Sequence, residues 1–245
     1  MKESTRRTFL AVQTASLCVA QTREQPKTSQ AGQAAVPSEV AGIRIVDSKY
    51  TKMALEELRD CSAPYLVNHA MRTFFFGALI GRQKRVTFDG EIFFLACALH
   101  DLGLTTKYAG PLPFEIQGAQ AARKLLDSAG LPAEKSQTVW DGIAMHPLAI
   151  SNFKPPEISL VGSGAGADVV GGGISSLAPD DVRAVLQAFP RLAFKRRFVE
   201  DCSAIASKYP GAAKNSFMRD TAERTNPSYQ VSNICDAITA APFDE

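Results

Sequence analysis

The spacing of apolar residues from residue 48 to residue 209 predicts helices, because it lacks the alternation that is typical of strands. Residues that commonly begin or end helices lie between the apolar segments. Ser62 and Asp89 can cap helix N-termini, and Gly103 can end the helix that precedes it. We therefore expect an all-α fold in a single domain. The expected helical segments are Ser48–Asp60, Ser62–Arg82, Asp89–His100, Phe114–Ala129, Glu134–Met145, Pro156–Val170, Pro179–Ala188 and Leu192–Tyr209.

The composition is that of an ordinary globular chain and excludes several classes of protein. The 245 residues are enough for one substantial core. Hydrophobic residues make up 45% and charged residues 21%, which excludes a wholly disordered chain, a collagen-like repeat and a coiled coil. No apolar run approaches the roughly 20 residues that cross a bilayer, so we expect no membrane partner. A net charge of +2 gives no reason to expect nucleic acid as a partner.

The first 20 residues resemble a bacterial twin-arginine export signal. Arg6 and Arg7 precede a Phe-Leu pair, and a weakly apolar stretch follows. This pattern predicts export of the protein by the twin-arginine route, with the periplasm as its destination. The alternative is a disordered basic start to a cytoplasmic protein.

The segment after the expected signal has a composition that differs from that of the folded domain. Residues 21–41 are rich in Gln, Ser, Thr, Ala and Pro and lack apolar periodicity, which predicts a flexible linker. The folded domain is then expected over residues 42–245, with its core between about residues 54 and 209.

Three closely spaced glycines, Gly162, Gly164 and Gly166, invite comparison with a phosphate-binding loop. A dinucleotide-binding loop follows a strand, however, whereas these glycines lie inside an expected apolar helix. We interpret them instead as positions where this helix packs closely against a neighbour.

The chain contains only three histidines, and two of them stand in a pattern that suggests a metal site. His69 lies within one expected helix, and His100 with Asp101 lies at the end of the next. Asp168 follows in an apolar, glycine-rich segment, where a carboxylate is costly to bury without a cation or hydrogen bonds. Imidazole and carboxylate ligands suit a divalent ion, with zinc favoured over manganese, iron or cobalt. The alternative is that these are ordinary buried residues with satisfied hydrogen bonds.

This pattern resembles the HD superfamily of metal-dependent hydrolases, in which a histidine, a His-Asp pair and a distant aspartate all lie on helices. The resemblance covers roughly Ala54 to Arg197, and within the superfamily the chain looks most like the cyanamide hydratase branch. It implies an HD-domain helical bundle in which His69, His100, Asp101 and Asp168 bind one divalent metal ion. The strings that support the branch are Val67–Arg72, Leu99–Thr106, Phe114-Glu115, Gly118-Ala119 and His146.

The resemblance also implies a reaction and further site residues. A divalent cation lowers the pKa of a bound water from 15.7 to about 7, so it can supply a nucleophile that attacks a nitrile carbon and gives a urea or amide. Glu115 could shuttle protons or hold a ligand histidine, and His146 could hydrogen-bond substrate or water. Arg72 could anchor substrate or pair with Asp101, and Asn68 is a further catalytic candidate.

Two other functions stay open at this stage. An HD phosphohydrolase acting on nucleotides or phosphomonoesters would gather cationic side chains around the metal, and only Arg72 and Lys107 lie near the motifs. This favours a small neutral substrate. A metal-stabilised binding domain without turnover is the third hypothesis, and a homo-oligomer is compatible with all three.

Overall fold

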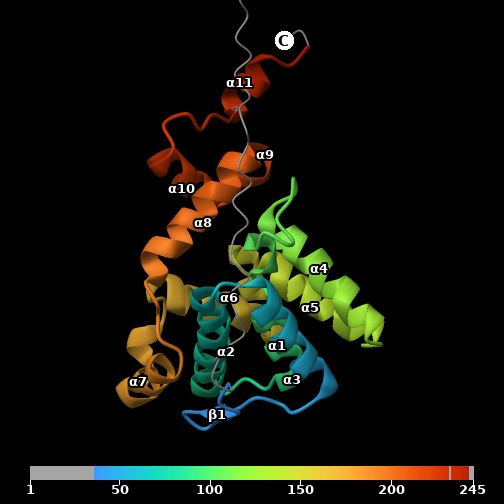
Figure 1. Ribbon diagram of the computed structural model, residues 1–245, viewed down its shortest axis with the longest axis vertical. Helices are drawn as coiled ribbons and strands as arrows, with labels where there is room; N and C mark the ends of the chain where they lie inside the picture. Colours follow the sequence, from blue (N-terminus) through green and yellow to red (C-terminus); the bar gives the residue numbers. More distant parts are fainter. Residues whose placement is uncertain (1–35, 232, 243–245) are drawn as a thin grey trace, which may run out of the picture. The chain divides into compact units, whose positions relative to one another are not determined.

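Helices dominate the computed structural model, which describes residues 36–231 and 233–242 (Figure 1). This confirms the expected all-α fold, and the chain from Pro37 onward forms one compact unit. No helix in the described ranges is long and apolar enough to span a bilayer. In chain order the elements are β1 (Glu39–Val40), β2 (Ile43–Arg44), α1 (Lys49–Cys61), α2 (Pro64–Lys84), α3 (Gly90–Leu99), η1 (Leu102–Leu104), α4 (Phe114–Ser128), α5 (Ala133–Met145), η2 (Ala149–Phe153), α6 (Pro156–Val170), η3 (Ile174–Ser176), α7 (Pro179–Ala188), α8 (Phe194–Lys208), α9 (Pro210–Ala213), α10 (Met218–Thr225) and α11 (Ile234–Thr239), where η marks a 3-10 helix.

A small hairpin, β1 and β2, occupies part of the segment for which a flexible linker was expected. Val40 pairs with Ile43 across a two-residue turn, and both turn residues, Ala41 and Gly42, have positive φ angles of 51° and 70°. Such a turn matches the twist of the flanking strands. Val40 is buried, so the folded unit begins before residue 42. The expected signal at residues 1–20 and most of the expected linker lie outside the described residues.

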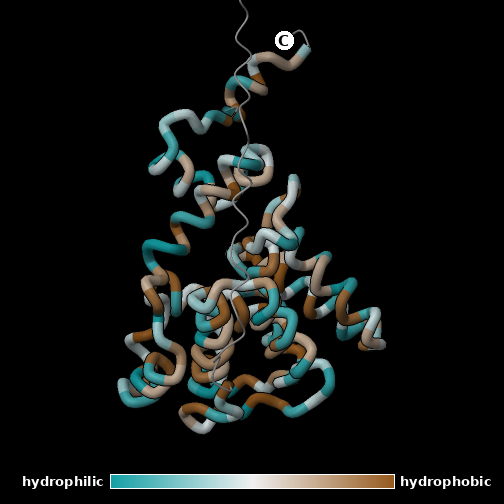
Figure 2. The backbone as a smooth tube through the Cα atoms, viewed as in Figure 1, coloured by the Kyte–Doolittle hydropathy of each residue, from teal (hydrophilic) through white to brown (hydrophobic). Residues whose placement is uncertain are grey.

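The core is built around α2, α3 and α6. Helix α2 is buried along most of its length and on all sides, as its nearly continuous apolar sequence dictates. Every residue of α3 from Ile92 to Leu99 is buried, and both helices pack against α6. The brown, apolar stretches of Figure 2 mark these inner helices within the part of the fold that carries α1 to α6.

Two of the three glycines in α6 allow the close packing that the sequence suggested. A Cβ atom on Gly164 would lie 2.0 Å from the carbonyl oxygen of Thr73 in α2, and one on Gly162 would lie 2.5 Å from the carbonyl oxygen of His146. Gly166 differs, because a Cβ atom there would meet nothing within 4 Å. The explanation is therefore correct for two glycines and wrong for the third.

Two expected helix boundaries are displaced. Ser62 ends α1 by donating its backbone N–H to Leu58, and Ala63 takes the N-cap position before Pro64. Gly103 does not adopt the left-handed conformation of a terminal glycine; it lies in η1, where a Cβ atom would come within 1.9 Å of the Phe114 carbonyl oxygen. It is thus a point of close approach to α4. The cap at Asp89 is confirmed, since its side chain accepts hydrogen bonds from two backbone N–H groups of α3.

A second apolar cluster joins α8, α9 and α10 to the beginning of α2 and α4. Its aromatic members include Phe194 and Phe198, whose rings stack with centroids 4.9 Å apart. The ring of Phe194 also lies 4.8 Å from the imidazole of His69, so this cluster closes one side of the predicted site. The buried members are Tyr65, Leu66, Leu104, Phe114, Phe194, Phe198, Cys202, Ala206, Ala213, Met218 and Ala222.

Candidate metal centre

Three buried side chains from α2 and the end of α3 converge to form the centre of the site. His69 lies within α2, and His100 and Asp101 lie where the chain leaves α3 and enters η1. The Nε2 atoms of His69 and His100 are 3.2 Å apart, and they lie 3.3 and 3.2 Å from Oδ2 of Asp101. All three residues are at most 3% exposed. They form a group that could hold a metal ion.

The second ring nitrogen of each histidine shows which atom carries the proton. Nδ1 of His100 lies 2.8 Å from the carbonyl oxygen of Cys97, and Nδ1 of His69 lies 2.7 Å from Oδ2 of Asp168. Because a carbonyl and a carboxylate only accept, each Nδ1 is the donor. When the rings are neutral, their Nε2 lone pairs therefore point into the cluster, the arrangement that metal binding requires.

The arrangement of polar atoms in the cluster suits a positive charge at its centre. Oδ2 of Asp101 is buried and makes no hydrogen bond, and two imidazole lone pairs face it. Ligand atoms about 2.0–2.2 Å from a zinc-like ion, at octahedral to tetrahedral angles, lie about 3.0–3.5 Å from each other. The observed separations of 3.2–3.3 Å fall in this range. Two histidines and one carboxylate would leave further coordination positions open for water or substrate.

The charges of these groups are strongly coupled. Burial raises the pKa of Asp101, but the imidazoles of His100 and His69 outweigh burial and hold that pKa well below its usual range. Burial lowers the pKa of His69, yet Asp101 and Asp168 outweigh it and the pKa rises. The two shifts have one cause: Asp101 stays ionised and favours a cation beside it, whether a proton or a metal ion.

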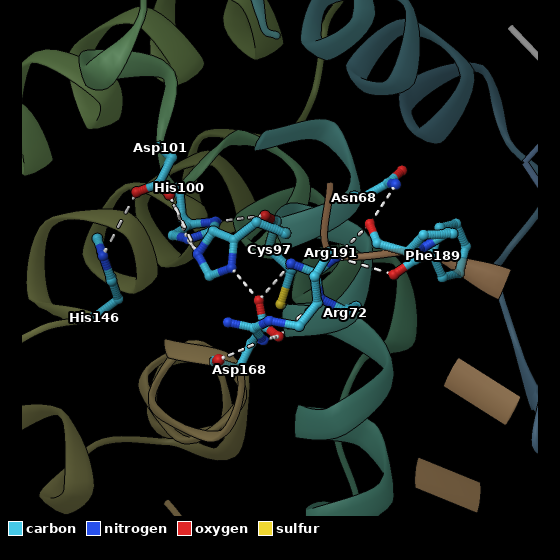
Figure 3. A network of polar contacts seen from close by, with 11 residues as sticks. Asn68, Arg72, Cys97, His100, Asp101, His146, Asp168, Phe189 and Arg191 are labelled. Atoms are coloured by element: carbon cyan, nitrogen blue, oxygen red, sulfur yellow. Dashed lines mark hydrogen bonds and ion pairs between the residues drawn. The ribbon is translucent and has the colours of Figure 1, made fainter. Parts of the chain in front are cut away.

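Asp168, expected as the fourth ligand, lies outside this cluster. Its Oδ2 faces Nδ1 of His69 at 2.7 Å and also accepts from Nη2 of Arg72 at 2.8 Å. Its Oδ1 accepts from Nε of Arg72 at 2.7 Å and from Nη1 of Arg191 at 2.6 Å (Figure 3). The carboxylate is thus held by two guanidinium groups and orients His69. Burial raises its pKa, but His69 and Arg72 hold that pKa well below the usual value.

Arg72 and Asn68 also differ from their expected roles. Arg72 is fully buried and pairs with Asp168 instead of Asp101, while its Nη1 donates to the carbonyl oxygens of Phe189 and Pro190. Nδ2 of Asn68 donates to the same Pro190 carbonyl at 2.8 Å. Neither side chain lines the cavity described next. Both tie α2 to the connection between α7 and α8 (Figure 3).

The cluster formed by His69, His100 and Asp101 opens into a cavity of about 330 Å³, and the other walls of this cavity are largely apolar. The cluster residues and His146 form its polar end. No lysine or arginine is among the described residues that line it. The complete lining is His69, His100, Asp101, His146, Pro147, Gly162, Ala165, Gly166, Val169, Val170, Phe198 and Phe217.

His146 lies at the end of α5 and faces the cluster, as the sequence suggested. Its Nδ1 donates to the carbonyl oxygen of Ile143 at 2.7 Å, so its Nε2 carries a lone pair. That Nε2 lies 4.0 Å from Oδ1 of Asp101, which is too far for a direct hydrogen bond (Figure 3). Burial lowers the pKa of His146 to about 3, and the neighbouring His100 adds to this. The ring is therefore a neutral hydrogen-bond acceptor at neutral pH.

Glu115 lies in a different cavity, of about 240 Å³, beside the N-terminus of α4. Its Oε1 accepts a long hydrogen bond of 3.4 Å from Ser216, and its buried Oε2 has no partner. Burial raises its pKa to about 7, and the negative charge of Asp101 adds to this. Holding a ligand histidine, one of its two expected roles, is wrong, because Asp168 and backbone carbonyls occupy those nitrogens. Proton shuttling by Glu115 stays a prediction.

Sequence reasoning missed three residues of the site: Arg191, Phe198 and Phe217. Phe194 and Phe198 stand four residues apart in α8, a spacing that indicates an inward helix face. Nothing in that spacing says that this face covers a metal cluster. Arg191 lies in a connecting segment, and only the folded chain brings it to Asp168.

Comparisons with known proteins add no relative to this description. No protein-family model matches the chain, and no curated protein matches it. The resemblance to the HD superfamily therefore stays a prediction from the motif residues.

Proposed function

We propose that the protein is a metal-dependent enzyme that adds water to a small neutral molecule, with hydration of cyanamide or a related nitrile as the reaction. One observation carries the proposal: Nε2 of His69, Nε2 of His100 and the unpartnered Oδ2 of Asp101 lie 3.2–3.3 Å from one another, separations that suit three ligands of one ion. The order of these residues along the chain, which resembles the cyanamide hydratase branch of the HD superfamily, supplies the reaction class.

His69, His100 and Asp101 would hold the divalent ion, and Asp168 would fix the orientation of His69 from behind. A divalent ion bound there can lower the pKa of water to about 7 and polarise a nitrile nitrogen. In the overall reaction the water oxygen adds to the nitrile carbon, both water protons end on nitrogen, and no group leaves.

His146 is the residue best placed to orient the water. Its Nε2 faces the cluster, and its lowered pKa of about 3 keeps this atom an acceptor at neutral pH. A water lying between His146 and Asp101 could donate a hydrogen bond to Nε2, which would aim its oxygen into the cavity. His146 is thus proposed to position the water by accepting a hydrogen bond from it.

The charges around the site favour a neutral substrate over a phosphate ester. Arg72 and Arg191 both pair with the Asp168 carboxylate, which balances one of their two positive charges, and neither side chain lines the cavity. A phosphomonoester would bring about two negative charges to a cavity whose described lining has no lysine or arginine. For this reason phosphohydrolysis is the weaker proposal.

The proposal is tested on purified protein reconstituted separately with zinc, manganese, iron or cobalt. Amide or urea formation is measured with cyanamide and acetonitrile, and phosphate release with a panel of nucleotides and phosphomonoesters. We expect nitrile hydration that depends on metal and is absent in His100→Ala. Phosphate release without nitrile hydration would establish the phosphohydrolase instead. A metal-loaded protein inactive on both panels would favour the binding-domain hypothesis.

A further inference from the structure

The volume of the cavity indicates how large a ligand it can hold. Its volume of about 330 Å³ corresponds to roughly eleven water molecules at about 30 Å³ each. An apolar cavity of about 150 Å³ is enough for benzene. Cyanamide contains only one carbon and two nitrogens besides hydrogen, so it would occupy a small fraction of this space. Most of the cavity would therefore contact a part of the ligand other than the reacting group.

The walls of that remaining space are apolar. Val169, Val170, Phe198 and Phe217 line it, and the rings of Phe198 and His69 lie with their centroids 5.7 Å apart. Val170 is 81% exposed and Phe217 38%, so these two residues border the opening of the cavity to solvent. The rings of Phe198 and Phe217 lie nearly parallel, with centroids 6.1 Å apart. An apolar group entering from solvent would therefore bury its surface against aromatic and branched side chains.

We infer that the substrate is an uncharged nitrile that carries an apolar group of about the size of a phenyl ring. This rests on the proposed function for the identity of the reacting group. The nitrile group of the substrate would lie at His69, His100 and Asp101. Its apolar group would lie against the apolar walls of the cavity. A charged substituent there would find no partner, because no lysine or arginine lines the described cavity and Asp101 is directed at the cluster.

Gly166 is the position that decides how large this apolar group can be. It lines the cavity, and a Cβ atom added to it would meet nothing within 4 Å. A larger side chain at residue 166 would therefore project into free space instead of displacing a neighbour. Gly164, two residues earlier and on the buried side of α6, lacks this freedom because the Thr73 carbonyl lies against it.

The test measures binding of benzonitrile and acetonitrile to the zinc-loaded protein by calorimetry. Benzonitrile adds five carbons to be buried, so we expect it to bind about 100-fold or more tightly than acetonitrile. Gly166→Val should remove most of this difference while acetonitrile binding stays unchanged. Gly211→Val is the matched control, because a Cβ atom there also meets nothing within 4 Å but Gly211 lines the Glu115 cavity. Zinc content of each variant is measured alongside.

The outcomes separate this inference from the proposed function. Equal binding of the two nitriles, or a preference that Gly166→Val leaves intact, overturns the inference even where cyanamide is hydrated. Tight benzonitrile binding that Gly166→Val abolishes supports it, and hydration assays on the same probe then test the reaction independently. Tight binding without hydration would leave the cavity's ligand class standing and refute nitrile hydration.

Discussion

Nδ1 of His69 lies 2.7 Å from a carboxylate oxygen of Asp168, and two arginines hold that carboxylate in place. A ligand histidine whose second nitrogen is fixed in this way keeps both its tautomer and its ring orientation. Asp168 therefore acts on the metal cluster through His69. A buried carboxylate between guanidinium groups also explains how α6 tolerates an aspartate in its apolar sequence.

Substitution of Asp168 should weaken metal binding without removing a ligand. We expect Asp168→Asn to lower zinc affinity by about 10–100-fold, the usual effect of losing a partner behind a ligand histidine. Affinity is measured by competition with a chelator. The cobalt-loaded variant should keep the visible absorption bands of the parent, because the ligand set is unchanged. Shifted bands, or complete metal loss, would mean that Asp168 itself binds the metal.

Removal of a direct ligand should have a larger effect. We expect about one divalent ion per chain in the parent and none in His100→Ala or Asp101→Asn, because two remaining ligands cannot hold the ion against dilution. Asp127→Asn, on the exposed side of α4, is the control and should keep its metal. Elemental analysis of dialysed protein measures this, and full occupancy in both ligand variants would refute the site.

The sequence predicted the three residues of the candidate metal site, but it did not predict the arginines that surround Asp168. His100 and Asp101 are adjacent at the end of a strongly apolar helix, so their meeting with His69 follows from helix packing. The sequence indicated that a buried Asp168 would need a cation or hydrogen bonds, and it predicted a metal ion as that cation. The cation is supplied by Arg72 and Arg191, and the second of these lies in a segment with no periodicity to indicate its direction.

Glu115 should make stability depend on pH. Its pKa rises from the ordinary 4.5 to about 7, so the native state keeps a proton that the unfolded chain releases between these values. The free energy of unfolding therefore falls as pH rises from about 4.5 to 7 and changes little above. Glutamine carries no charge, so Glu115→Gln does not lose stability in this way. The free energy of unfolding of the variant, relative to that of the parent, should rise by about 3 kcal/mol between pH 4.5 and pH 8.

Urea unfolding of both proteins at the two pH values measures the change attributed to Glu115. Glu56→Gln, at an exposed position of α1, is the control and should track the parent. Zinc is removed from all samples with chelator, so that the pH dependence of metal binding does not enter the comparison. An advantage for Glu115→Gln that is the same at both pH values would contradict the assignment.

The amino-terminal prediction is independent of the site. Arg6 and Arg7 are expected to be read by an export receptor through their guanidinium groups, whose planar shape lysine does not reproduce. Replacing both with lysine should leave the protein in the cytoplasm with residues 1–20 intact. Cell fractionation and N-terminal sequencing measure this. A parent protein found in the cytoplasm and starting at Met1 would contradict export and leave the metal site unaffected.

Glycine positions show where sequence reasoning about the fold reaches its limit. The sequence suggested one explanation for all of Gly162, Gly164 and Gly166, because they share a helix and a spacing of two residues. Successive positions two apart point about 200° away from each other around a helix, so they cannot all face the same neighbour. Which of them contacts α2 depends on the rotation of α6, and that is set by packing.

Gly164 and Gly166 therefore give a matched pair of substitutions on α6. Gly164→Ala should destabilise the fold by about 2–3 kcal/mol, because its Cβ would lie 2.0 Å from the Thr73 carbonyl and force α2 and α6 apart. Gly166→Ala should stabilise it by about 0.5–1 kcal/mol, because alanine favours the helix and its Cβ meets nothing. Chemical unfolding of zinc-loaded protein measures both. Equal effects of the two substitutions would mean that α6 does not present Gly164 to α2.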